Sequence, residues 1–186
     1  MIEIEEFEYL SKKYTPYINS LIEKNKKFYK LNSPIKWQFG FNEKLAFFAW
    51  SDKNTNLITL NIASVDYSIQ NNQNLLVELF LLHEMRHVYQ YQEAELYISN
   101  PLICENIEMA KKWYYEFQEY VPASENNKNF NYYLQESEKD AFVYSYAIIM
   151  HKYGKVEYLN IPKVYEVLEI ERELDHLINI FKNKNL

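Results

Sequence analysis

The sequence predicts a single α+β domain over residues 1–186, mostly helical, with a small antiparallel sheet of about three strands packed on a central helix. Two patterns predict this class: alternating apolar residues before residue 62, and long helical periods after residue 70. The composition agrees, because 186 residues suit one compact domain with a substantial core. Only 2 glycines are present, which disfavours both nucleotide-cradling glycine loops and many-turned β-barrels.

The N-terminal third predicts a helix followed by strands. Residues 4–29 carry apolar side chains close to helical spacing, and Pro16 is a candidate position for a break in this helix. Three runs with strand character then follow, separated by polar turns: 36–41, 45–50 and 56–62. The simplest connection between them is an antiparallel meander. The edge of the last strand is expected to be free to pair with an extended peptide.

The remaining two thirds predict helices. Residues 74–92 contain no Gly or Pro, and the strongly apolar run Leu75–Leu82 indicates a buried central helix. Further helices are expected after this one, with a polar loop at 124–129 and Gly154 as a C-cap: 101–120, 130–153 and 162–181.

The central helix carries the most informative pattern, His83-Glu84-Met85-Arg86-His87. Positions i and i+4 lie on one face of a helix, so both imidazoles can reach a single metal ion. Glu84 lies about 100° around the helix from His83, where it can hold a metal-bound water without being a ligand itself. Burying these polar groups after an apolar run would cost free energy unless a metal and partners satisfied them. The pattern therefore predicts a zinc site with His83 and His87 as ligands and Glu84 as the catalytic residue.

A catalytic zinc site needs a third protein ligand and keeps its fourth position for water. The candidates are the carboxylates Glu136, Glu138 and Asp140 in the predicted helix 130–153. Glu136 and Glu138 point about 160° apart on a helix, so periodicity alone does not choose between them. Carboxylates also suit the N-terminus of a helix without any metal, because of the helix dipole.

The two motifs together resemble the gluzincin-like metallopeptidases, and most closely the small ImmA/IrrE-like and phage-associated zincins. These pair HExxH with a downstream Glu-x-(Asp/Glu)-Ala segment, which Glu138, Asp140 and Ala141 match. The resemblance implies a zincin-like fold, Zn²⁺ as cofactor and Glu138 as the third ligand. It covers about residues 45–150 and departs at Phe142, where the family often has Asn or Asp.

The expected function is that of a zinc-dependent endopeptidase in which Glu84 activates a zinc-bound water, with narrow specificity for a regulatory protein. The alternative is a catalytically silent zincin-fold module that binds metal or a protein partner. An intact Glu84 favours the enzyme, because a binding module needs no general base. The oxyanion donor stays open among the tyrosines near the motifs: 89, 91, 132, 133 and 144.

Composition limits the partners and the location. A net charge of −6 without a basic block argues against nucleic acid, and no apolar run approaches membrane-spanning length. The single Cys104 and an acidic start without signal-peptide regions are typical of a cytoplasmic protein. We therefore expect a protein or peptide substrate, no nucleic acid and no membrane, whereas the oligomeric state stays open.

Overall fold

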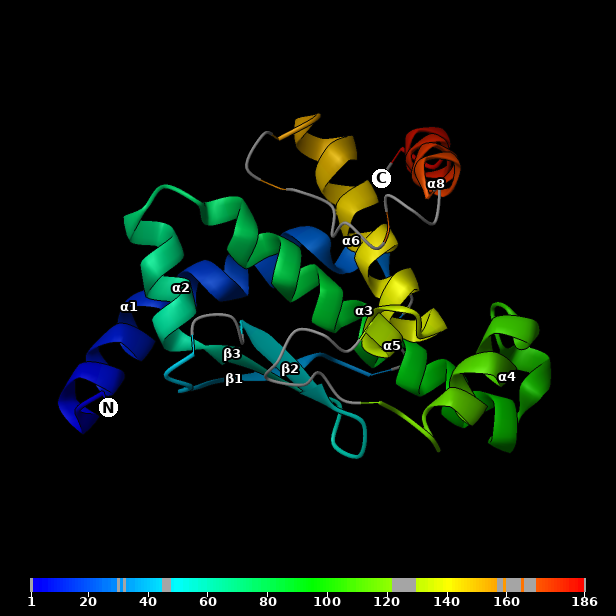
Figure 1. The fold of residues 1–186 in the computed structure, drawn as a ribbon, viewed down its shortest axis with the longest axis horizontal. Coiled ribbons are helices and arrows are strands. Elements are labelled where there is room, and N and C mark those ends of the chain that lie inside the picture. Colours follow the sequence, from blue (N-terminus) through cyan, green and yellow to red (C-terminus); the bar gives the residue numbers. More distant parts are fainter. Residues whose placement is uncertain are drawn as a thin grey trace. The chain divides into compact units, whose positions relative to one another are not determined.

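The computed structural model describes residues 2–29, 31, 33–44, 48–121, 130–156, 159, 165 and 170–185 (Figure 1). These residues are mostly helical with one small three-stranded sheet, so the predicted α+β class is confirmed. The chain divides into two compact units, Met1–Val88 and Tyr89–Leu186, and helix α3 (Asn74–Ser99) contributes residues to both. That the whole chain forms one domain stays a prediction.

The sheet of the first unit is mixed, not antiparallel. Its strands are β1 (Lys36–Gly40), β2 (Ala49–Asp52) and β3 (Leu57–Asn61), in the order β1-β3-β2. β3 pairs parallel with β1 and antiparallel with β2, so the predicted meander is wrong. The reason lies in β3, where Ile58 and Leu60 are fully buried. Such a strand is most stable in the centre of a sheet. Both of its edges are therefore paired, and the expected free edge at β3 is also wrong.

A tight turn joins β2 to β3, close to the predicted position. The carboxylate of Asp52 closes it, because Oδ1 accepts hydrogen bonds from the backbone N–H groups of Asn54 and Thr55, each at 2.9 Å. Asn56 takes the left-handed conformation at φ 54° that asparagine tolerates. The predicted strand 45–50 is described only from residue 48 onward.

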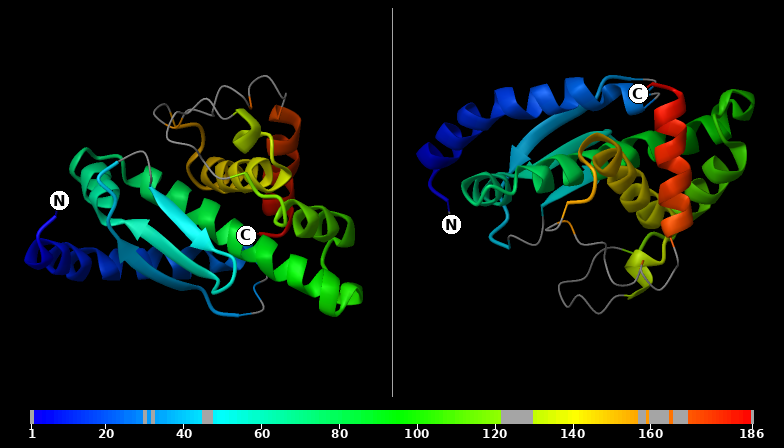
Figure 2. Two further views of the ribbon diagram at one scale, coloured as in Figure 1. Left: turned by 60° about the horizontal axis from the view of Figure 1, so that its bottom comes forward. Right: turned by 90° about the horizontal axis from the view of Figure 1, so that it is seen from above.

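Helix α1 (Ile4–Asn25) runs through Pro16 without ending, so the candidate break at this position is wrong. Pro16 is exposed, and a helix can absorb the lost hydrogen bond by bending on its solvent side. Helix α2 (Ile62–Gln70) was not predicted. It begins directly after β3, where the Asn61 side chain caps it by accepting a hydrogen bond from the Ala63 N–H. In Figure 2 (left) the sheet lies in front of α1 and the first part of α3.

Contacts from Asn25, Tyr29 and Phe48 help to hold α3 within the first unit. The amide of Asn25 donates to Glu78 Oε1 at 2.9 Å, and both side chains are buried. After the short 3-10 helix η1 (Lys26–Phe28), the Tyr29 hydroxyl donates to the carbonyl of Leu82 at 2.8 Å. The rings of Phe48 and Phe80 stack with centroids 4.7 Å apart. These contacts tie the two turns before His83 to α1 and to the start of β2.

The second unit is helical in its described part, which excludes 122–129 and most of 157–169. Besides the end of α3 it contains η2 (Pro101–Ile103), α4 (Ile107–Glu116), α5 (Phe130–Tyr133), α6 (Glu136–Tyr153) and α8 (Glu171–Asn183). The predicted helix 101–120 is therefore shorter, and the predicted helix 130–153 is split.

Gly154 ends α6 at φ 74°, as predicted for a C-cap. The last predicted helix is described only over α8, because its expected start near Pro162 and the expected loop 124–129 lie outside the described residues. Among the helices that are described, none is long and apolar enough to cross a membrane.

Candidate metal centre

The histidine turn, His83 to His87, lies on α3 as the spacing predicted. The Nε2 atoms of His83 and His87 are 3.0 Å apart, and their rings meet edge to face with centroids 4.6 Å apart. Both side chains are only 4% exposed. Two ligands of one tetrahedral zinc ion, each about 2.0–2.1 Å from the metal, lie about 3.3 Å apart. The spacing of the two nitrogens is thus close to that of a shared ion.

Apolar side chains surround this turn. Met85 lies between the two histidines and is fully buried, as are Leu81, Leu82 and Val88. Glu84 is also buried, at 5% exposure, so the motif places three ionisable groups inside an apolar helix environment. Burying ionisable groups costs free energy unless hydrogen bonds or a metal ion satisfy them. Three such groups in one buried helical turn are therefore typical of a functional site.

The third candidate ligand, Glu138, lies in the first turn of α6 and is fully buried. Its Oε1 accepts a hydrogen bond of 2.5 Å from the Tyr120 hydroxyl. The other two carboxylates considered from the sequence are placed differently: Glu136 is exposed and Asp140 is half-buried. Burial therefore separates Glu138 from Glu136, which helical periodicity alone did not do.

Two polar side chains, Glu116 and Gln135, fix the start of α6. The Glu116 carboxylate, at the end of α4, accepts the backbone N–H groups of Glu136 and Ser137 at 2.7 and 2.9 Å, and the Ser137 hydroxyl as well. The Gln135 side chain accepts from the Val121 N–H at 2.8 Å and donates to the Val121 carbonyl at 2.9 Å. A carboxylate at a helix N-terminus satisfies otherwise unpaired N–H groups and complements the helix dipole.

Within the second unit, α3 and α6 are joined by Gln90, which is fully buried. Its amide donates to the Ser137 carbonyl at 2.9 Å and to Asp140 Oδ2 at 2.7 Å. Gln90 follows His87 by three residues on the same continuous helix, and Ser137 directly precedes Glu138. The contact therefore brings the turn that carries Glu138 to the part of α3 that follows the motif.

His83, His87 and Glu138 form a group that could hold a metal ion. One ligand atom from each of His83, His87 and Glu138 lies within 4.8 Å of the other two, and all three side chains are buried. Two imidazole nitrogens and one carboxylate oxygen are a donor set of catalytic zinc sites, which leave a fourth position open. The residues present thus fit the metal that the motif suggested.

Sequence reasoning missed three residues near Glu138. Tyr120 and Gln90 make the hydrogen bonds above, and Tyr165 is fully buried with no hydrogen-bond partner for its hydroxyl among the described residues. Burial, and then the negative charge of Glu138, raise the pKa of Tyr165. Gln90 had a detectable signal, because it lies three residues after His87. Tyr120 and Tyr165 had none, since each is 18 or more residues from the motifs.

The tyrosines considered as oxyanion donors are not distinguished by their contacts. Tyr89 donates to Glu105 Oε2 at 2.9 Å, and Tyr132 and Tyr133 contact each other edge to face. His151 contacts the ring of Phe181, and neither it nor His176 belongs to the ligand group. The oxyanion donor therefore stays open.

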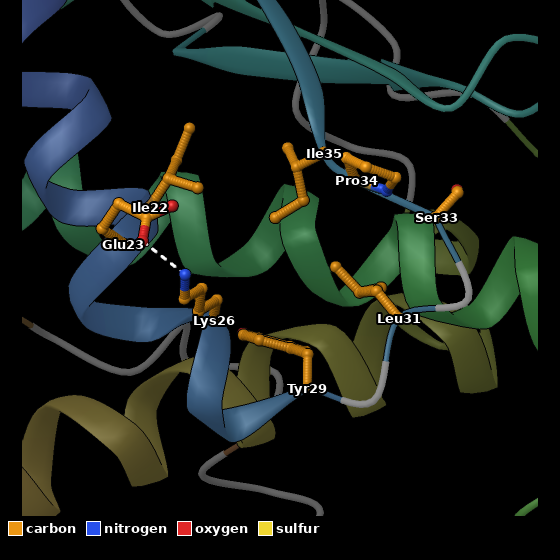
Figure 3. Close-up of a pocket in the computed structure, with 8 residues that line it drawn as sticks. All are labelled: Ile22, Glu23, Lys26, Tyr29, Leu31, Ser33, Pro34 and Ile35. Atoms are coloured by element: carbon orange, nitrogen blue, oxygen red, sulfur yellow. Dashed lines mark hydrogen bonds and ion pairs between the residues drawn. The ribbon is translucent and has the colours of Figure 1, made fainter.

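A pocket of about 480 Å³ lies elsewhere in the first unit, beside the end of α1 (Figure 3). Ile22, Leu31 and Ile35 form its apolar walls, and the Glu23–Lys26 ion pair of 2.5 Å lies at its side. None of the predicted ligands or Glu84 lines this pocket, so it is distinct from the candidate metal centre.

No family model, curated protein or solved structure matches this chain.

Proposed function

We propose that this chain is a zinc-dependent peptidase in which His83, His87 and Glu138 hold the metal and Glu84 is the general base. The observation that carries the proposal is the buried group of two imidazoles and one carboxylate, whose ligand atoms lie within 4.8 Å of one another. Two ligands come from one helical turn, and the third belongs to a helix start with its own polar supports. This arrangement of ligands and supporting hydrogen bonds favours a metal site over a chance cluster of polar residues.

Zinc is the metal that suits this donor set best. Calcium and magnesium prefer sites made of oxygen ligands, whereas imidazole nitrogens with one carboxylate are typical of catalytic zinc. When bound, zinc supplies the Lewis acidity that makes water a nucleophile near neutral pH and polarises a carbonyl oxygen.

The role of Glu84 follows from its position. It neighbours one ligand in sequence and points about 100° away from it around the helix, which makes it a poor third ligand between the histidines. Its carboxylate would accept the proton of the attacking water and pass it to the leaving amine of the peptide. Burial at 5% exposure keeps bulk water away from this carboxylate.

The substrate would be an extended peptide paired with the outer edge of β2. β2 is an edge strand, and Phe48, directly before it, stacks on Phe80 of α3. Phe80 precedes Glu84 by four residues, so the two side chains lie on the same face of the helix. A peptide that adds to β2 would therefore run beside the general base.

The test compares peptide hydrolysis by the zinc-loaded wild type and by Glu84→Gln, using a broad peptide library. We expect Glu84→Gln to keep its fold and its zinc but to lose about 10²–10⁴-fold in rate, because a positioned general base contributes that much. Glu95→Gln is the matched control, since Glu95 is an exposed glutamate on the same helix. It should leave the rate unchanged.

Two outcomes would overturn the proposal. Equal hydrolysis by wild type and Glu84→Gln would place the base elsewhere. A wild type that holds one zinc ion per chain and cleaves no peptide or regulatory protein would favour the alternative, a zincin-fold module that binds metal or a protein without turnover.

A further inference from the structure

We propose that Tyr120 is a positioning residue for Glu138, and that its hydroxyl sets the zinc affinity of the site. The proposal rests on the zinc site proposed above and assigns a residue that neither motif contains. Its basis is the hydrogen bond of 2.5 Å from the Tyr120 hydroxyl to Glu138 Oε1, made to a carboxylate that is itself fully buried.

Tyr120 is held in place through its chain neighbour Val121 and through its own ring. Its neighbour Val121 is clamped by Gln135, through one hydrogen bond to its N–H and one to its carbonyl. The Tyr120 ring also meets the ring of Tyr132 edge to face, with centroids 6.5 Å apart. The backbone and the ring are therefore fixed by contacts that do not involve the hydroxyl.

The Gln135 clamp also links Tyr120 to Glu138 along the chain. Gln135 is the residue directly before α6, and Glu116, near Tyr120, caps the same helix start. The segment 116–121 thus makes three separate attachments to residues 135–138. Because these attachments fix the segment, the Tyr120 hydroxyl is already positioned to donate to the Glu138 carboxylate.

The hydroxyl has a definite chemical effect on a metal ligand. A hydrogen bond to an ionised oxygen is stronger than one between neutral groups, and it fixes the plane of the carboxylate. Outer partners of this kind orient metal ligands, and their loss typically weakens metal binding by 10–100-fold. The hydroxyl is the group that donates to Glu138, and the side chain that carries it is 39% exposed.

The test is the zinc dissociation constant of wild type and Tyr120→Phe, measured at one pH by competition with a chromogenic chelator. We expect Tyr120→Phe to bind zinc about 10–100-fold more weakly. Phenylalanine keeps the ring contact with Tyr132, so the metal-free variant should keep its fold, and it should unfold somewhat below the wild-type temperature because the buried Glu138 carboxylate loses a donor. Tyr115→Phe is the matched control, because Tyr115 is an exposed tyrosine five residues earlier, and it should bind zinc as wild type does.

A double variant separates positioning from a purely structural role. If Tyr120 acts through Glu138, Tyr120→Phe should weaken zinc binding no further in a Glu138→Gln background. Equal zinc affinity of wild type and Tyr120→Phe would overturn this inference alone, as would an equal loss in both backgrounds. A wild type that binds no zinc would overturn the proposed site as well, so the two failures are distinguishable.

Discussion

The histidine turn of α3 and the start of α6 supply the proposed ligands, but they are stabilised in different ways. Around His83 and His87 the neighbours along the helix are buried apolar side chains, Met85 among them. Around Glu138 the contacts are hydrogen bonds: the Tyr120 hydroxyl, 18 residues away in sequence, donates to Glu138, and the neighbouring Gln135 side chain bonds to the backbone of Val121. His83 and His87 are thus positioned by helical spacing within an apolar core. Glu138 is positioned by hydrogen bonds around the start of α6, which we call the polar network.

This difference has a physical reason. Helical spacing alone aligns two imidazoles at i and i+4, so the histidine turn needs only a stable helix. A single buried carboxylate has no such partner on its own helix and must be oriented by donors from elsewhere. The polar network should therefore affect metal affinity more than stability, and the apolar packing should do the reverse.

The largest expected effect is on stability, from Met85→Ala. Met85 is fully buried, and its truncation should lower the free energy of unfolding by about 2–5 kcal/mol, through lost burial and the cavity left behind. Urea denaturation of the metal-free protein measures this directly. A loss below about 1 kcal/mol would show that the histidine turn does not depend on its apolar packing.

A smaller effect is expected from Gln90→Ala, which tests the polar network. The variant removes the hydrogen bonds to Ser137 and Asp140, one of them to a carboxylate, so the free energy of unfolding should fall by about 1–3 kcal/mol. Zinc affinity should fall as well, because Gln90 fixes the turn that carries Glu138. Gln118→Ala, in an exposed glutamine, is the control. If Gln90→Ala binds zinc as tightly as wild type, Gln90 does not help to position Glu138.

The smallest expected effect is that of Asp52→Asn, in the turn between β2 and β3. Hydrogen bonds from the Thr55 side chain and backbone lower the pKa of Asp52 from its ordinary value of 3.8. A lowered pKa in the folded state stabilises the fold above the ordinary value, and this contribution disappears as the pH falls through the lowered pKa. The variant should be slightly less stable than wild type at pH 7, and this difference should shrink as the pH falls through the lowered pKa of Asp52. A difference that does not depend on pH would contradict the role of the charge.

Local spacing in the sequence predicted the α+β class, the start of α3 at Asn74, the Gly154 cap and the pairing of His83 with His87 on one helix face, whereas Glu138 was implied only by the family resemblance. The order of the strands was not predictable in the same way. Alternation shows that a strand has a buried face, but it does not show which strand is central. The complete burial of Ile58 and Leu60 decides that, and it depends on neighbours far along the chain.

The surroundings of Glu138 were less predictable still. Burial separates Glu138 from Glu136, and it depends on tertiary packing, in which the segment 116–121 brings the Tyr120 hydroxyl to the Glu138 carboxylate. Tyr120 reaches Glu138 across 18 residues, and no periodicity connects two such positions. Long-range polar contacts of this kind depend on tertiary packing, whereas the i and i+4 pair depends on the helix alone.

The central claim is that one zinc ion is held by His83, His87 and Glu138. Its most direct test is the zinc content, by mass spectrometry, of wild type, His83→Ala, Glu138→Gln and the control Glu136→Gln after dialysis against a weak chelator. We predict about one zinc ion per chain in wild type and in Glu136→Gln, and little in the other two, because two imidazoles and one carboxylate are all required. Equal zinc content in wild type and His83→Ala, or loss of zinc in Glu136→Gln but not in Glu138→Gln, would contradict the claim.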